Sequence, residues 1–270
     1  MTNVGVSGVA GKMGQTLVQM INRTDGLTLS GAVEHPDSES IGSDAGSMAG
    51  IGSLNIEIVP SVELVGSKID VMIDFSVPEA ALRTVEACAR VGAGIVIGTT
   101  GFESSQLDRI RQSAERVPIL MAPNMSVGIN VAFKLIEVAA SILGDTVDVE
   151  VYEMHHRQKI DSPSGTAVKM GEILAKALGR SLTDDAVYGR VGNSGSRDTK
   201  TIGFHSARGG DVVGDHTVTF AGTGERIEIT HRAQSRDNFA AGAMLAVAFI
   251  AKMRIEKSTG LYDMSDVLGI

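Results

Sequence analysis

The sequence predicts an α/β protein with two domains: an N-terminal doubly wound parallel sheet and a C-terminal α+β domain with a mixed or antiparallel sheet. The length of 270 residues suits two domains, since one domain takes about 150 residues. Up to about residue 126, short apolar runs alternate with helical patterns, which is typical of a parallel sheet with helices on both faces. Beyond that point, residues 146–153 alternate strictly between apolar and polar side chains, which indicates a strand with one exposed face.

The elements of the N-terminal half follow from apolar runs of four to seven residues. These runs predict strands at residues 4–7, 27–33, 55–59, 71–75, 94–97 and 118–121. Helical patterns between them predict one helix ending near residue 21 and two more at residues 78–90 and 104–116. Because strands and helices alternate, this half is expected to form one domain over residues 1–126.

The C-terminal half begins with a predicted helix at residues 130–143, and a second helix at residues 166–178 follows the alternating strand. Three further strands, at about residues 200–207, 212–220 and 225–231, are joined by short glycine-rich turns and predict an antiparallel meander. The apolar stretch 239–255 predicts a last helix that can pack on either domain. We place the second domain at residues 127–236.

Composition and charge exclude several classes of protein. With 43% hydrophobic residues the chain can bury a core, and its formal charge of -8 disfavours binding to nucleic acid or to an acidic membrane surface. The longest apolar run, residues 240–251, is shorter than the ~20 residues that span a bilayer. Cys88 is the single cysteine and no signal-peptide pattern is present, so a cytoplasmic protein without membrane or nucleic-acid partners is expected.

A glycine loop predicts a dinucleotide site in the first domain. Gly8, Gly11 and Gly14 follow a strand and open a helix, the arrangement in which backbone amides approach a pyrophosphate at a helix N-terminus. Glu34 lies 20 residues beyond Gly14 at the end of the second strand, where an acid can accept both ribose hydroxyls. The alternative for the glycines alone is a tight strand-to-helix turn, but the combination favours a Rossmann-like domain.

Two further loops follow the carboxyl ends of predicted strands, at residues 98–101 and 122–125. Ligands of open α/β sheets bind beyond these ends, so both loops are candidates for cofactor contact. Asp74, Phe75 and Ser76 occupy a third such position. The alternative for each loop is a turn closed by a Ser, Thr or Asn side chain.

Residues 155–166, HHRQKIDSPSGT, carry the densest chemistry. Histidine exchanges protons near neutral pH, and lysine can hold an anion or donate a proton. The Ser-Gly-Thr sequence at a helix start offers hydroxyls and free amides to a carboxylate, so the segment predicts a site for a small acidic substrate. Taken separately, the parts also describe a helix cap and a solvated basic loop. His155 and His156 are adjacent and would point to opposite faces of a strand, so no metal site is expected.

These motifs together resemble the 4-hydroxy-tetrahydrodipicolinate reductase (dihydrodipicolinate reductase) family of lysine and diaminopimelate biosynthesis. The similar segments are GVAGKMG with a downstream VEH, IGTTGF, APNMSVGIN, EMHHRQKIDSPSGTA, ITHRAQSR and GLYDMSDVL. The resemblance covers the whole chain and implies a homotetrameric NAD(P)H-dependent oxidoreductase that reduces a cyclic dicarboxylic imine. It also implies that residues 237–270 return to the first domain, and that residues 127–236 bind substrate and form the tetramer.

The resemblance further implies roles for particular residues. His155 would be the acid–base residue and Lys159 the proton donor. The cofactor would contact Gly8, Val9, Ala10, Gly11, Lys12, Met13, Glu34, His35, Gly98, Thr99, Thr100, Ala122, Pro123, Asn124 and Met125. The small dicarboxylate substrate would contact His156, Lys159, Ser164, Gly165, Thr166 and Arg236.

Two departures from the family pattern affect the choice between NADH and NADPH. Members often carry Arg where this chain has His35, and Lys12 replaces a frequent Arg. Use of both cofactors is therefore expected. A different two-domain dehydrogenase or a non-catalytic nucleotide sensor would share the first domain, but neither needs the His-His-Lys and Ser-Gly-Thr combination.

Overall fold

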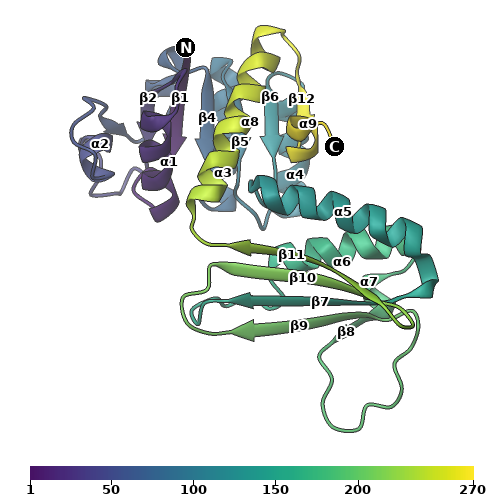
Figure 1. The fold of residues 1–270 in the computed structure, drawn as a ribbon. Coiled ribbons are helices and arrows are strands. Elements are labelled where there is room, and N and C mark those ends of the chain that lie inside the picture. Colours follow the sequence, from purple (N-terminus) through teal and green to yellow (C-terminus); the bar gives the residue numbers. More distant parts are fainter. The chain divides into compact units, whose positions relative to one another are not determined.

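The computed structural model describes all 270 residues and divides into two compact units (Figure 1). Unit 1 comprises Met1–Val127 and Arg236–Ile270, and unit 2 comprises Gly128–Ser235. The C-terminal segment therefore packs with the N-terminal half of the chain. The substrate-binding and tetramer-forming roles given to residues 127–236 stay predictions.

Unit 1 contains a seven-stranded sheet in the order β12-β6-β5-β4-β1-β2-β3. Every neighbouring pair in it is parallel. The strands are β1 (Thr2–Ser7), β2 (Leu27–Val33), β3 (Ile58–Val59), β4 (Val71–Asp74), β5 (Gly94–Ile97), β6 (Pro118–Met121) and β12 (Gly260–Tyr262). Strand order runs outward from β1 in both directions, which is the signature of a doubly wound sheet. This confirms the predicted fold class.

Helices cover both faces of this sheet (Figure 1). On one face, α1 (Lys12–Arg23) and α8 (Asp237–Ile255) bury Leu17, Val247 and their neighbours. On the other, α3 (Pro78–Val91) and α4 (Ser104–Ala114) bury Val85, Ile110 and the free thiol of Cys88, whose pKa burial raises. The smaller helices are α2 (Ala45–Met48), η1 (Val62–Leu64), η2 (Gly66–Lys68) and α9 (Met264–Leu268).

Helix α8 approaches the loop after β6 very closely at Gly242. A β-carbon at this position would lie 1.7 Å from the carbonyl oxygen of Met125. Only glycine permits that approach, so α8 fixes the backbone of one of the two loops predicted to contact cofactor.

Unit 2 is a five-stranded mixed sheet in the order β11-β10-β7-β9-β8. Its strands are β7 (Asp148–His155), β8 (Ala186–Tyr188), β9 (Ile202–Arg208), β10 (Gly214–Ala221) and β11 (Arg226–Ala233). One face packs against α5 (Val127–Leu143) and α6 (Gly165–Leu178), and their contact forms the core of the unit. Two short helices, η3 (Gly144–Thr146) and α7 (Leu182–Asp185), complete it.

The predicted antiparallel meander of three consecutive strands is wrong. Strand β9 pairs with β7 in parallel, and β10 pairs with the opposite edge of β7, so only β10 and β11 form a hairpin. The Gly209–Gly210 turn instead passes the end of β7, where the Gly209 amide donates to the carbonyl of His155 at 2.9 Å. Because strands lie about 4.8 Å apart, a loop this short can still cross one intervening strand.

Two helical segments have the length and composition of membrane-crossing helices. Val127–Thr146 and Asp237–Ile255 have mean hydropathies of 1.6 and 1.4. The uninterrupted apolar run at residues 240–251 covers only part of the second segment. The second is α8, which packs against the sheet of unit 1 as a core helix of a water-soluble protein does.

Candidate active site

The glycine loop between β1 and α1 has the geometry of a phosphate cradle. Gly8 adopts φ +71°, which favours glycine, and a β-carbon on Gly14 would lie 2.2 Å from the Gly8 carbonyl oxygen. Gly11 caps α1 without a side-chain hydrogen bond, and the first turn contains no acidic residue. The first amides of α1 are therefore available to an anion, and exposed Lys12 stands at the same turn.

Glu34 lies against this loop. Its carboxylate accepts hydrogen bonds from the amides of Ala10 and His35, each at 2.9 Å. Carboxylate oxygens have further lone pairs, so these bonds orient the group and leave capacity for ribose hydroxyls. The His35 side chain is exposed, and its Nδ1 accepts from the amide of Asp37 at 3.3 Å.

A cavity of about 730 Å³ opens beside Glu34 within unit 1, lined among others by Gly8, Gly11 and His35. Its volume falls in the range of small-molecule sites. Arg83 of α3 also lines it and makes no ion pair, whereas Arg90 is paired with Glu63 at 2.6 Å. Sequence reasoning missed Arg83, because nothing local distinguishes it from any exposed helix arginine.

Asp74 organises the loops after β4 and β5. The carboxylate is fully buried, and its Oδ1 accepts from the hydroxyls of Ser76 at 2.6 Å and Thr99 at 3.0 Å. Gly98 lies so close to Phe75 that a β-carbon would meet the ring at 2.1 Å. Asp74 is thus a structural anchor for the predicted cofactor loop.

The predicted cofactor residues differ in how exposed they are. Val9, Thr99, Ala122 and Met125 are buried. Thr100 and Pro123 are exposed, and the Asn124 side chain accepts from the Ser126 amide at 2.9 Å. Met13 and Ala10 are partly buried at the phosphate cradle.

In unit 2, strand β7 positions the second group of candidates. Its alternation puts Val149, Val151, Glu153 and His155 on the face covered by α5 and α6. The register brings Arg208 of β9 opposite His155 and His216 of β10 opposite Glu153.

These side chains form a buried polar cluster. His155 Nδ1 lies 2.6 Å from Glu153 Oε2, and Arg208 Nη1 contacts the two carboxylate oxygens at 2.8 and 2.9 Å. Arg208 Nη2 also donates to the carbonyl of Asp161, whose carboxylate pairs with Lys159 at 2.9 Å. One guanidinium thus links both predicted catalytic residues.

The N-terminus of α6 closes the same cluster. Ser164 caps this helix by accepting from the Ala167 amide at 3.2 Å, and its hydroxyl lies 2.9 Å from His216 Nε2. The first turn carries no acidic residue, and no atom from outside the local chain lies within 4 Å of the place a β-carbon on Gly165 would take. A helix N-terminus with a capping hydroxyl and no acidic residue suits a carboxylate.

Burial sets the ionisation of this cluster. It lowers the pKa of His155, although Glu153 acts in the opposite direction. Burial and the nearby His155 lower the pKa of His216 to about 3. Burial raises the pKa of Glu153, but hydrogen bonds from Ser206, Arg208 and His155 outweigh it and hold the pKa below its usual value. Both histidines are therefore neutral, and the glutamate charged, near neutral pH.

Unit 2 contains all of the predicted substrate residues except Arg236. His155, Lys159, Ser164 and Gly165 belong to the cluster or its border, and Thr166 follows in the first turn of α6. The remaining two predicted residues are His156, whose carbonyl accepts from the Lys159 amide at 3.1 Å, and Arg236, which belongs to unit 1. His156 is partly buried with its Nδ1 unpaired, and Arg236 is exposed at the start of α8 in unit 1. No group of three or more His, Cys, Asp or Glu side chains is placed to hold a metal ion.

Sequence reasoning missed Glu153, Arg208 and His216. Glu153 stands two residues before His155 on a strand, so period-two alternation alone could have paired them. Arg208 and His216 come from strands 53 and 61 residues further along, and only the tertiary pairing brings them here.

The two groups of residues define a class: an enzyme with a dinucleotide-type sheet in one unit and a buried acid–base cluster in the other. Two family sequence models, described as "Dihydrodipicolinate reductase, N-terminus" and "Dihydrodipicolinate reductase, C-terminus", match residues 2–125 and 128–268. The chain belongs to the dihydrodipicolinate reductase family. The family expected from the sequence motifs is thereby confirmed.

Individual relatives agree with this assignment. The chain is 53% identical over its whole length to the 4-hydroxy-tetrahydrodipicolinate reductase of Syntrophotalea carbinolica, all of which is covered. It is 49% identical to that of Methylococcus capsulatus, over 98% of this chain and 97% of the relative. Its fold is similar to a dipicolinate-bound dihydrodipicolinate reductase from Paenisporosarcina sp. TG-14, with a TM-score of 0.74, 26% identity and 97% coverage of both chains.

Proposed function

We propose that this protein reduces 4-hydroxy-tetrahydrodipicolinate to tetrahydrodipicolinate, with loss of water, in lysine and diaminopimelate biosynthesis. Family membership over the full chain supports the reaction. The observation that carries the mechanism is the buried cluster of His155, Glu153 and Arg208 beside Lys159 and the N-terminus of α6.

A nicotinamide cofactor supplies the hydride that this reaction needs. The glycine cradle at Gly8–Gly14, the orientation of Glu34 and the adjoining cavity fit a dinucleotide. We infer that both NADH and NADPH are used. Glu34 suits the free ribose of NADH. Arg83 and His35 line the same cavity and can donate hydrogen bonds to the 2′-phosphate of NADPH.

The substrate is a ring with two carboxylates. We infer that one docks at the amides of Gly165 and Thr166 and the Ser164 hydroxyl, which together form an anion site at the start of α6. Lys159 and His156 would contact the other. Dipicolinate, found in the related solved structure, belongs to the same chemical class.

The reaction consumes one hydride and one proton and releases one water. As the C4 hydroxyl leaves, Lys159 Nζ gives the proton that completes the water, and His155 takes a proton from the neighbouring ring carbon on the imine side. After hydride reaches C4, His155 returns its proton to that carbon. Lys159 therefore supplies the net proton, and a neutral histidine suits the first step.

The activity is tested by following oxidation of NADH or NADPH, with substrate generated from pyruvate and aspartate semialdehyde. Loss of absorbance that depends on both precursors is the expected result; its absence with either cofactor contradicts the proposal. Lys159→Ala should lower kcat by ~10²–10⁴-fold. An unchanged kcat with only a higher KM would remove Lys159 as the proton donor.

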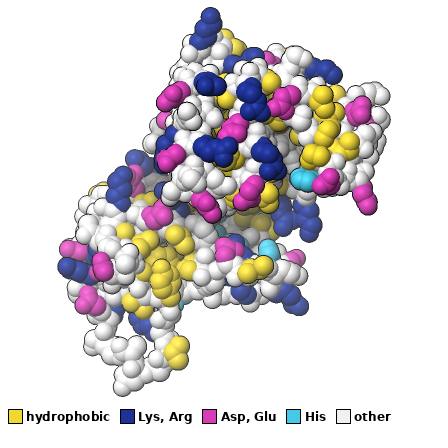
Figure 2. Space-filling model, turned by 180° about the vertical axis from the view of Figure 1, so that it is seen from behind, with side chains coloured by type: hydrophobic (Ala, Val, Ile, Leu, Met, Phe, Trp, Pro, Cys, Tyr) yellow, Lys and Arg dark blue, Asp and Glu magenta, His cyan; other side chains and the backbone are white.

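We further infer a cytoplasmic homotetramer in which unit 2 makes the contacts. The sheet of unit 2 packs its helices on one face, and the other face carries the exposed ring of Tyr152. Figure 2 shows apolar side chains lying among interspersed acidic and basic ones. Sedimentation of the wild-type protein tests the assembly: a tetramer supports this inference, and a monomer at micromolar concentration contradicts it.

A further inference from the structure

The Glu153–His155 pair is far more buried than an ordinary surface ion pair. The Glu153 side chain is 1% exposed and that of His155 is 10% exposed, and their atoms are 2.6 Å apart. A buried carboxylate needs compensation, and Arg208 provides it through contacts to both oxygens. The carboxylate is therefore ionised and able only to accept hydrogen bonds.

This geometry fixes which nitrogen of His155 carries the proton. Because ionised Glu153 only accepts, Nδ1 of His155 must be the donor, and the neutral ring then has a bare Nε2. No protein group is hydrogen-bonded to Nε2. The nitrogen left to exchange a proton with a ligand is therefore Nε2.

Strand β10 leaves space at this nitrogen. Gly214 lies beside the ring, and a β-carbon there would come within 3.0 Å of Nε2. That separation is tighter than ordinary contact, so any side chain at position 214 would crowd the reactive edge of the imidazole.

Arg208 also connects the pair to the loop that carries Lys159. Its Nη1 holds Glu153, while its Nη2 donates to the Asp161 carbonyl. Arg208 therefore holds both the carboxylate that orients His155 and the backbone next to the Lys159–Asp161 pair.

We propose that Glu153, held by Arg208, is the positioning residue that keeps His155 in its Nδ1-protonated form with Nε2 toward the reacting atoms. This inference rests on the proposed reduction, in which Nε2 takes and then returns one proton, so no further reactant is needed. Glu153 does not touch substrate; it acts through His155, as the buried carboxylate of a catalytic triad acts through its histidine.

The groups that face His155 set the expected pH dependence. They are Glu153 on its own strand, Arg208 on β9, His216 on β10 and Lys159 in the following loop. Burial lowers the pKa of His155, Glu153 raises it, and the charges of Lys159 and Arg208 lower it further. In Glu153→Gln the pKa of His155 falls further, so the acid limb of kcat/KM, which reports the protonation of a required neutral base, moves to lower pH.

The first test is the tautomer of His155 in the wild-type protein, read from long-range ¹⁵N–¹H spectra and assigned by loss of one signal set in His155→Ala. The inference predicts a proton on Nδ1 and none on Nε2. A proton on Nε2 overturns it. This measurement needs no substrate, so it tests the tautomer of His155 even if the protein does not catalyse the proposed reaction.

The second test compares two matched variants. Glu153→Gln should lower kcat by ~10²–10⁴-fold with little change in KM, and should shift the acid limb. Glu150→Gln removes the same charge from the opposite face of β7, next to His205, and should keep the wild-type pH profile. A folded Glu153→Gln protein with wild-type kcat and pH profile overturns the inference; if that variant does not fold, the wild-type tautomer decides.

Discussion

Two glutamates of strand β7 each pair with a histidine, one pair on each face of the unit 2 sheet. Glu153 and His155 are 2.6 Å apart on the face covered by helices, and Glu150 and His205 are 2.8 Å apart on the other face. Residue type and distance are nearly the same in the two pairs. Their surroundings differ, and the surroundings determine what each pair can do.

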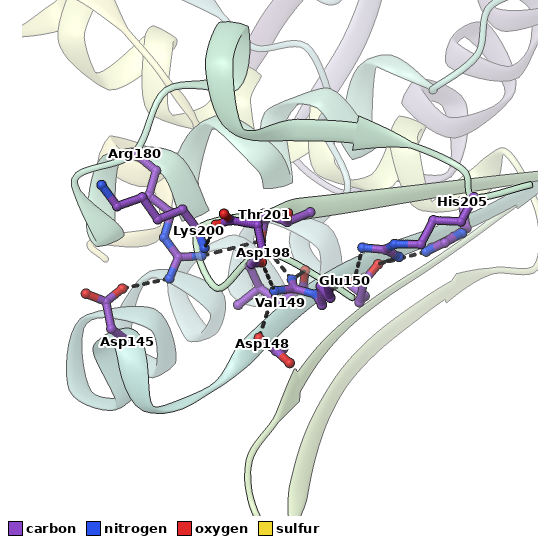
Figure 3. A network of polar contacts seen from close by, with 11 residues as sticks. Asp145, Asp148, Val149, Glu150, Arg180, Asp198, Lys200, Thr201 and His205 are labelled. Carbon is purple, nitrogen blue, oxygen red and sulfur yellow. Dashed lines mark hydrogen bonds and ion pairs between the residues drawn. The ribbon is translucent and has the colours of Figure 1, made fainter. Parts of the chain in front are cut away.

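The Glu150 pair belongs to a structural network (Figure 3). Glu150 accepts from Arg190, Arg197 and His205, and Arg197 also bonds the carbonyls of Val149 and Thr201. These contacts tie the segment between β8 and β9 to the sheet. All functional groups of Glu150 are occupied by the protein, so nothing remains to act on a ligand.

Each pair leaves one histidine nitrogen without a hydrogen bond, Nε2 of His155 and Nδ1 of His205, so the difference lies in what surrounds the two rings. His155 contacts His216, which is bonded to the α6 cap residue Ser164, whereas the His205 ring stacks on Tyr152 with centroids 4.8 Å apart. The neighbours of the second nitrogen, and not the pair itself, therefore make Glu153–His155 the candidate acid–base centre.

The largest expected effect is on kcat, and it differs between His155 and His205. His155→Ala should lower kcat by ~10²–10⁴-fold, because it removes the acid–base group. His205→Ala, the matched control, should keep kcat close to wild type. Steady-state kinetics of both variants check this. An equal loss of kcat in the two would contradict the claim that only the helix-covered face carries the acid–base group.

The second effect is on stability and belongs to the outer pair. Burial opposes ionisation of Glu150, but hydrogen bonds from Arg190, Arg197 and His205 lower its pKa from 4.5 to about 2. Glu150→Gln should destabilise the protein at neutral pH by about 1–3 kcal/mol, because half-buried cations lose their partner.

The pH dependence of that loss has a defined sign. Since the folded pKa is depressed, the stabilisation by Glu150 is complete above pH 4.5 and is lost as the pH falls toward about 2. Chemical denaturation of wild type and Glu150→Gln at several pH values should show the two converging at acid pH. A stability difference that stays constant across this range would contradict the assignment.

The smallest expected effect concerns a third histidine, His35, which is exposed beside Glu34. His35→Arg adds a permanent cation at the cofactor cavity and should raise kcat/KM for NADPH over NADH by about tenfold, the effect of one charge-assisted hydrogen bond. His35→Gln is the matched control and should leave the ratio near wild type. A ratio unchanged by arginine would place the 2′-phosphate elsewhere.

The sequence alone could predict features that depend on neighbouring residues. The parallel sheet of unit 1 and the glycine cradle follow from local runs and spacing, and strands Leu27–Val33, Gly94–Ile97 and Pro118–Met121 have the expected bounds. Long-range pairing in unit 2 could not be read this way. Nothing near β9 shows that it pairs with β7 instead of β10, so Arg208 and His216 remained hidden as neighbours of His155.

The central claim is that the helix-covered face of β7, and not its other face, forms the acid–base site. Titrating the ¹⁵N-labelled protein with dipicolinate and following each histidine by NMR tests this claim directly. We predict that the signals of His155 and His216 shift with dipicolinate concentration, while those of His205 stay in place. Shifts at His205 with unchanged signals from His155 and His216 would contradict the account.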